Sequence, residues 1–127
     1  MVGTPNSIVR LDKLDTGFAE SVTKAGGEKV NLCIQCGTCS ASCPIGTRTA
    51  LRTRQVIRRV QLGFRDKVLL DKGLWLCTTC STCKNRCPRD VDPMGVLISV
   101  RSLLVEGGQV PRTIMDALEG VYKYGNP

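Results

Sequence analysis

The chain of 127 residues is 42% hydrophobic and 4% aromatic, and its 18 Lys and Arg against 11 Asp and Glu give a formal charge of +7. This length allows one domain with a modest aliphatic core and excludes two independently stable domains. No stretch approaches about 18 uninterrupted apolar residues and no positive start leads into an apolar run, so we expect neither a membrane span nor a secretory signal, and a cytoplasmic protein.

The segment at 1–14 has no clear period and is predicted to be a tail or docking arm, which leaves a folded domain at 15–127. A short helix follows, with a cap at Asp15 or Thr16 and an end at the glycine pair 26–27. This helix leads into the first of two cysteine-rich runs.

A longer helix with a basic outer face is predicted after the first run, over 48–62, with Thr47 as its cap. Its inner face would carry Ala50, Thr53, Val56, Ile57 and Val60, and its outer face Arg48, Arg52, Arg58 and Arg59. The arginine face suits an acidic partner, but a charged helix face is also commonly just solvated. No aromatic side chains interleave with these arginines to stack bases, so we expect no nucleic-acid partner.

Three further helical segments complete the predicted order. A shorter piece over 65–76 leads to the second run, and Asp92 before Pro93 predicts the capped start of a helix that the glycine pair 107–108 stops. The last helix is predicted over 111–124. No segment alternates with the period of two that a strand requires, so the predicted fold class is all-α, with both cysteine runs in turns between helices.

All eight cysteines lie in two runs of the same spacing, C-x2-C-x2-C-x3-C-P: "CIQCGTCSASCP" at 33–44 and "CTTCSTCKNRCP" at 77–88. Three thiolates at intervals of three residues can converge on one cubic cluster. The fourth cysteine precedes a proline that redirects the chain, and in two-cluster proteins with this run it ligates the other cluster. The spacing therefore predicts two 4Fe-4S clusters with crossed ligation. The first cluster is predicted to bind Cys33, Cys36, Cys39 and Cys87, and the second Cys77, Cys80, Cys83 and Cys43.

Zinc sites built from four cysteines also use C-x2-C pairs, but zinc gives no reason for a third cysteine at the same interval or for the proline in both runs. The chain has no histidine, which removes mixed Cys/His zinc sites and Rieske-type ligation. A disulfide framework is disfavoured in a reducing cytosol. Two clusters with four cysteines each leave no iron open for substrate, so we predict no catalytic residues and a role in electron transfer.

The second run also carries Lys84 and Arg86, whereas the first run has no charged residue. Reduction adds negative charge to a cluster, and nearby positive charge favours it. We therefore expect the loss of both charges to make at least one cluster harder to reduce.

The segments "GGEKVNLCIQCGTCSASCP", "TALRTRQVIRRVQLG" and "LWLCTTCSTCKNRCP" together resemble the small iron–sulfur C subunit of heterodisulfide reductase, over about residues 15–124. The resemblance implies an alpha-helical ferredoxin fold and a fixed position in a larger oxidoreductase complex. There it implies that the chain passes electrons from a flavin-containing A subunit to a B subunit, which reduces the mixed disulfide of coenzyme M and coenzyme B during methanogenesis.

The resemblance also implies a hydrogenase or a formate dehydrogenase, attached to the A subunit, as a further partner. Related helical ferredoxin domains serve succinate dehydrogenase and anaerobic glycerol-3-phosphate dehydrogenase, so an electron-transfer subunit of another respiratory oxidoreductase is an alternative function. A freely diffusing ferredoxin and a zinc-stapled binding module are two others.

Overall fold

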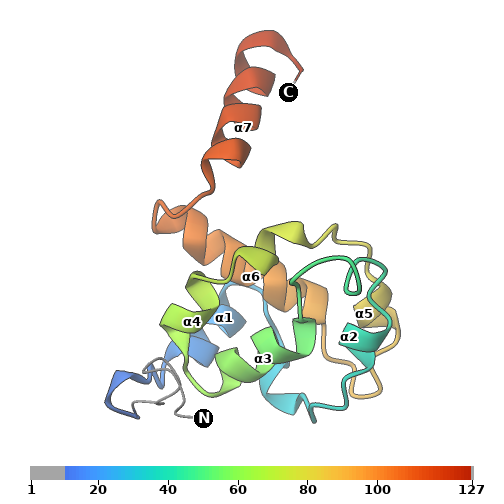
Figure 1. Cartoon of the computed structure of the whole chain (residues 1–127). Coiled ribbons are helices and arrows are strands. Elements are labelled where there is room, and N and C mark those ends of the chain that lie inside the picture. Colours follow the sequence, from blue (N-terminus) through green and yellow to red (C-terminus); the bar gives the residue numbers. More distant parts are fainter. Residues whose placement is uncertain (1–10, 127) are drawn as a thin grey trace, which may run out of the picture.

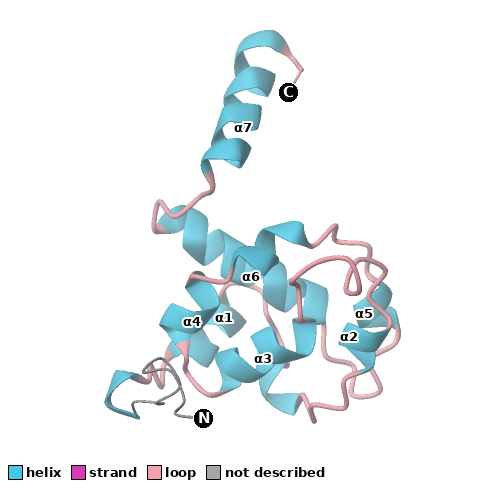
Figure 2. Ribbon diagram, viewed as in Figure 1, coloured by secondary structure: helices cyan, strands magenta, loops and turns pink. Residues whose placement is uncertain are grey.

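A computed structural model describes residues 11–126 of the chain, and every regular element in this range is a helix (Figures 1 and 2). The α-helices are α1 (Phe18–Lys24), α2 (Thr38–Ala41), α3 (Thr53–Gln61), α4 (Arg65–Leu69), α5 (Thr82–Asn85), α6 (Pro93–Glu106) and α7 (Arg112–Tyr124). The 3-10 turns are η2 (Leu11–Lys13), η3 (Val30–Leu32) and η4 (Lys72–Leu76). The predicted all-α class is confirmed. The tail or docking arm predicted at 1–14 stays a prediction, because all but its last four residues lie outside the described range.

The hydrophobic core lies where α1, α3 and α4 pack around α6 (Figure 1). It is aliphatic except for Phe18, as the low aromatic content predicts. Its buried members are Phe18, Val22, Val30, Leu51, Val56, Ile57, Val60, Val68, Leu74, Val96, Leu97, Val100 and Leu104. None of the helices in residues 11–126 is long and apolar enough to cross a membrane.

The start of α3 differs from its prediction. The helix begins at Thr53 and not after Thr47, because residues 44–50 form turns and bends, and carbonyls within 46–51 bind a side chain. Arg52 donates from Nη1 to the carbonyl oxygens of Gly46, Thr49 and Leu51, at 2.6, 2.8 and 2.9 Å. Ala50, predicted on the inner face, is consequently exposed. The other four predicted inner residues are all buried, Thr53, Val56, Ile57 and Val60.

The remaining helix boundaries test the predicted caps. The Asp92 carboxylate accepts a hydrogen bond from the Gly95 amide at 2.9 Å, which confirms this residue as the cap of α6. The predicted cap of α1, Asp15 or Thr16, is wrong, because Gly17 occupies the cap position. The helical piece predicted at 65–76 divides into α4 and η4, because the side chain of Asp71 accepts a hydrogen bond from the Gly73 amide at 2.9 Å and starts a new turn.

The last helix, α7, extends away from the rest of the molecule (Figure 1). It starts at Arg112, one residue after the predicted start, and ends at Tyr124 as predicted, with Gly125 at a positive φ of 73° as its C-cap. None of its residues is buried. The body that holds the cysteines therefore consists of the elements from α1 to α6.

Candidate functional site

Two small cavities are each lined by four cysteines, three from one run and the fourth from the other. The first cavity is lined by Cys33, Cys36, Cys39 and Cys87, and the second cavity by Cys77, Cys80, Cys83 and Cys43. Counting their open mouths, they enclose about 300 Å³ and about 340 Å³. All eight cysteines lie in the described part of the chain and are free thiols. The cysteines predicted to share a ligand therefore line the same cavity.

The two runs fold in the same way, which explains how each surrounds a cavity. A 3-10 turn, η3 or η4, ends just before the first cysteine, and the third cysteine lies on a one-turn helix, α2 or α5. The residue before each one-turn helix has a positive φ, 87° at Gly37 and 61° at Ser81. The runs thus contain a helical turn that the sequence analysis did not predict. Packing of α2 against α5 brings the two runs together (Figure 1).

A second pair of left-handed residues lies between the first two cysteines of each run. Gln35 has a φ of 61° and Thr79 a φ of 55°. Non-glycine residues adopt this region at a cost of roughly 1–2 kcal/mol and keep it where the surrounding structure holds them there. The alternation of left-handed and ordinary backbone coils each run, so that its first three cysteines line one cavity.

The thiols differ in how readily they ionise. Hydrogen bonds of 3.4 Å to Thr38 and Thr82 lower the pKa of the Cys36 and Cys80 thiols. Burial raises the pKa of the Cys83 thiol to about 11, with a further contribution from neighbouring Cys77. A buried thiolate therefore needs a positively charged partner, and a coordinated metal deprotonates a thiol outright. The chemistry of this donor set suits a metal-containing ligand in each cavity.

The first cysteine of each run is held by a side chain from the helix that follows the run. Gln61 donates from Nε2 to the carbonyl oxygens of Val30 and Cys33, both at 3.1 Å. Arg101 does the same in the second half: it donates to the carbonyl oxygen of Leu74 from Nε at 2.9 Å, and to that of Cys77 from Nη2 at 2.7 Å. These two carbonyl clamps, missed by the sequence analysis, occupy equivalent places in their helices.

The equivalence can be read from the helix starts. Gln61 stands eight residues after the start of α3 at Thr53, and Arg101 eight residues after the start of α6 at Pro93. Arg101 also stacks over the ring of Trp75, with its guanidinium carbon 5.6 Å from the ring centroid. An alignment of the two helices on their starts would have found the pair, whereas an alignment of the cysteines alone does not.

Substitution of Arg101 tests the clamp. We expect Arg101→Leu to destabilise the fold by about 2–3 kcal/mol, because it leaves two carbonyl groups without their charged donor. Arg101→Gln should cost about 1 kcal/mol, because an amide performs this task at Gln61 in the other half. Urea unfolding followed by circular dichroism measures both. Equal losses in the two variants would contradict a hydrogen-bonding role.

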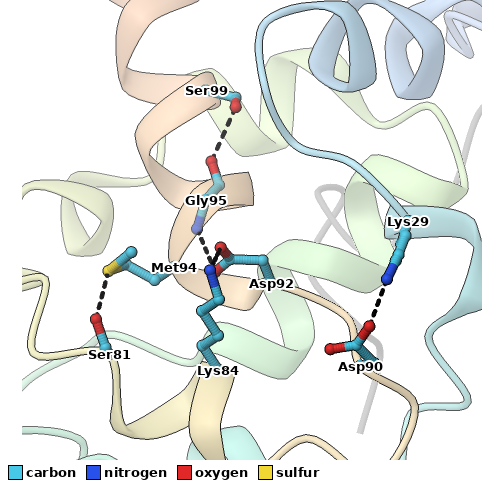
Figure 3. A network of polar contacts seen from close by, with 8 residues as sticks. All are labelled: Lys29, Ser81, Lys84, Asp90, Asp92, Met94, Gly95 and Ser99. Carbon is cyan, nitrogen blue, oxygen red and sulfur yellow. Dashed lines mark hydrogen bonds and ion pairs between the residues drawn. The ribbon is translucent and has the colours of Figure 1, made fainter.

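Ion pairs join the second run, and the segment directly after it, to their surroundings (Figure 3). Lys84 pairs with Asp92 at 2.8 Å, and Lys29, shortly before the first run, pairs with Asp90. The charge of Lys84 is thus compensated by a neighbouring carboxylate, whereas Arg86 forms no ion pair within residues 11–126. The expected effect of these two charges on reduction remains a prediction.

Comparisons with known proteins agree with this geometry. The model of a family described as a 4Fe-4S dicluster domain matches residues 29–91, a range that contains all eight cysteines. The chain is 42% identical over 102 residues to the C subunit of the H(2):CoB-CoM heterodisulfide,ferredoxin reductase of Methanothermobacter thermautotrophicus. The match covers 80% of this chain and 55% of that protein.

Two further relatives carry similar names. An iron–sulfur C subunit of the CoB–CoM heterodisulfide reductase of Methanocaldococcus jannaschii is 38% identical over 94% of this chain and 68% of its own length. The C subunit of the ferredoxin:CoB-CoM heterodisulfide reductase of Methanosarcina mazei is 48% identical over 68% of this chain and 53% of its own length. The chain thus spans between half and two thirds of the length of most of these relatives. With this identity and a 4Fe-4S dicluster domain, the chain belongs to the family of heterodisulfide reductase C subunits.

Proposed function

We propose that each cavity binds one 4Fe-4S cluster with crossed ligation. The ligands of the first cluster are Cys33, Cys36, Cys39 and Cys87, and those of the second are Cys77, Cys80, Cys83 and Cys43. The observation that carries the proposal is the grouping of four thiols from both runs around each cavity. The match to a dicluster family over residues 29–91 supports it independently. When bound, such a cluster accepts and releases electrons at a potential that its protein surroundings set.

The chain's own residues shield both sites, and the Gln35 amide donates a hydrogen bond to the Cys33 sulfur at the first site. Ile57 and Val91 line the first cavity, and Leu51 and Leu97 line the second. These side chains are all buried in the core, so they exclude water from the inner wall of each cavity. A hydrophobic shell of this kind influences the redox potential of a metal site. Because α2 packs against α5, both sites lie at one junction of the fold.

From these features we propose that the chain is an electron-transfer subunit of a cytoplasmic heterodisulfide reductase complex. It holds two neighbouring redox sites, and we assign it no catalytic residue. Its proposed partners are a flavin-containing A subunit as donor, with a hydrogenase or formate dehydrogenase attached, and a catalytic B subunit as acceptor. The complex would reduce the heterodisulfide of coenzyme M and coenzyme B in methanogenesis. The names of the relatives, which refer to CoB-CoM heterodisulfide reductases, support this assignment.

Metal analysis tests the first part of the proposal. We expect anaerobically purified protein to be brown and to contain about eight irons and about eight acid-labile sulfides per chain, as two 4Fe-4S clusters require. Colourless protein with about two zincs per chain would instead identify zinc sites built from four cysteines. Co-purification from native extract tests the second part. The chain should co-migrate with larger flavin and iron–sulfur chains, and migration as a free protein of this size would contradict membership of a complex.

A further inference from the structure

The two cavities are built on one plan, but one position carries a charge in the first and none in the second. The second residue of α3, Arg54, lines the first cavity, and the second residue of α6, Met94, lines the second cavity. The fifth residues of the two helices, Ile57 and Leu97, also line the first and second cavities. Equivalent helix positions thus face equivalent cavities, and Arg54 stands where Met94 stands in the other half.

The side chain of Arg54 lies against the first run. Its Cδ and Nε would be 3.6 Å and 3.9 Å from a Cβ placed on Gly37, which is the residue directly after Cys36. The guanidinium group therefore lies beside the peptide of a predicted ligand. Within residues 11–126 no carboxylate forms an ion pair with Arg54. Among these residues, its positive charge is therefore uncompensated at the mouth of the first cavity.

Met94 occupies the equivalent place with a neutral thioether. Its sulfur accepts a hydrogen bond of 3.3 Å from Ser81, which is the counterpart of Gly37 in the second run (Figure 3). The first run also has a hydrogen bond to a cysteine sulfur that the equivalent residue of the second run does not make. The Gln35 amide donates to the Cys33 sulfur at 3.4 Å, whereas its counterpart Thr79 donates to a carbonyl oxygen of its own run at 2.7 Å.

Two of the positive charges near the second cavity, those of Lys84 and Arg101, are engaged. Lys84 is paired with Asp92. Arg101 is bound to the carbonyl oxygens of Leu74 and Cys77, and it does not line the cavity. The guanidinium of Arg54 differs from both, because it lines its cavity without a carboxylate partner among residues 11–126.

We propose that Arg54, assisted by the Gln35 amide, holds the reduction potential at the first cavity above that at the second. Reduction adds one negative charge to a site, and positive charge and hydrogen bonds to sulfur stabilise that charge. When an electron passes between the sites, one electron leaves the second and one arrives at the first, with no proton or atom transferred. At equilibrium, a single electron held by this chain therefore occupies the first site. The inference relies on the proposed binding of a cluster in each cavity.

An EPR-monitored redox titration at low salt, on the full chain purified anaerobically with its clusters, tests the inference. In Arg54→Met we expect the reduction equilibrium of the first site to weaken about tenfold, which lowers its midpoint by about 59 mV for a one-electron couple. The midpoint of the second site should move much less. Arg54→Lys keeps the charge and is the matched control, with an expected shift below about half of that value.

The reciprocal variant Met94→Arg tests the same idea from the other cavity and does not depend on iron retention by Arg54→Met. It should raise the midpoint of the second site by a similar amount, and the double exchange should reverse the order of the two sites. Iron content distinguishes a failure of cluster binding from a failure of the proposed role of Arg54. Parent protein without iron contradicts cluster binding itself. Full iron content with both midpoints unchanged in Arg54→Met and Met94→Arg overturns the role of Arg54 and leaves the clusters in place.

Discussion

Replacement of Cys43 by serine is expected to remove or alter the cluster of the second cavity and to leave the cluster of the first cavity intact. Cys43 belongs to the first run, yet it lines the second cavity together with three cysteines of the second run. The iron content of purified Cys43→Ser should fall from about eight to about four per chain, since one 4Fe-4S cluster of two is lost. EPR spectra of the reduced protein should lose one of two signals.

Four serine variants, two from each run, decide which cysteines bind the same cluster. Under crossed ligation, Cys43→Ser should lose the same EPR signal as Cys77→Ser, because both residues line the second cavity. Cys33→Ser should lose the other signal, together with Cys87→Ser. If Cys43→Ser and Cys33→Ser instead lose the same signal, ligation follows the runs and the crossed assignment is rejected.

Truncation of Phe18 is expected to cause the largest loss of stability among single substitutions in α1. This side chain is 1% exposed, and α1 packs against both α3 and α6. Phe18→Ala should lower the free energy of unfolding by about 3–5 kcal/mol, because it removes buried apolar surface and leaves a cavity. Urea unfolding of the cluster-loaded protein under anaerobic conditions, followed by circular dichroism, measures the change.

The other phenylalanine is a matched control. Phe64 is half-buried at the start of α4 and has the ammonium of Lys67 at 5.2 Å from its ring centroid. Phe64→Ala should therefore cost about half as much as Phe18→Ala or less. Equal losses of unfolding free energy in the two variants would show that burial in the described core does not determine how much each ring contributes to stability.

The sequence predicts this fold best where local chemistry decides the backbone. Asp92 caps a helix that starts with proline, and Gly107 ends the same helix, so both boundaries of α6 are visible in the sequence. The start of α3 is not visible, because it depends on the three carbonyl bonds of Arg52 across a turn. Helical periodicity alone cannot distinguish such a turn from the first turn of a helix.

The cysteine groupings follow from spacing, but the residues that support them do not. Cys77 follows Cys33 by 44 positions, whereas Pro93, the start of α6, follows Thr53, the start of α3, by 40. No single offset aligns both the runs and the helices. The equivalence of Arg54 and Met94 therefore emerges only once the helix starts are known.

Because both runs line each cavity, a ligand in each cavity would close two loops of the chain, one nested inside the other. A ligand that binds all four cysteines of the second cavity closes the loop between Cys43 and Cys77, and one in the first cavity closes the wider loop between Cys39 and Cys87. A single cross-link over either loop restricts the unfolded chain by about 4 kcal/mol in the chain-entropy model. The segment that contains α3, α4 and η4 lies inside both loops. After loss of one ligand, this segment therefore still lies in a loop that the other ligand closes. The unfolded chain keeps one of its two constraints.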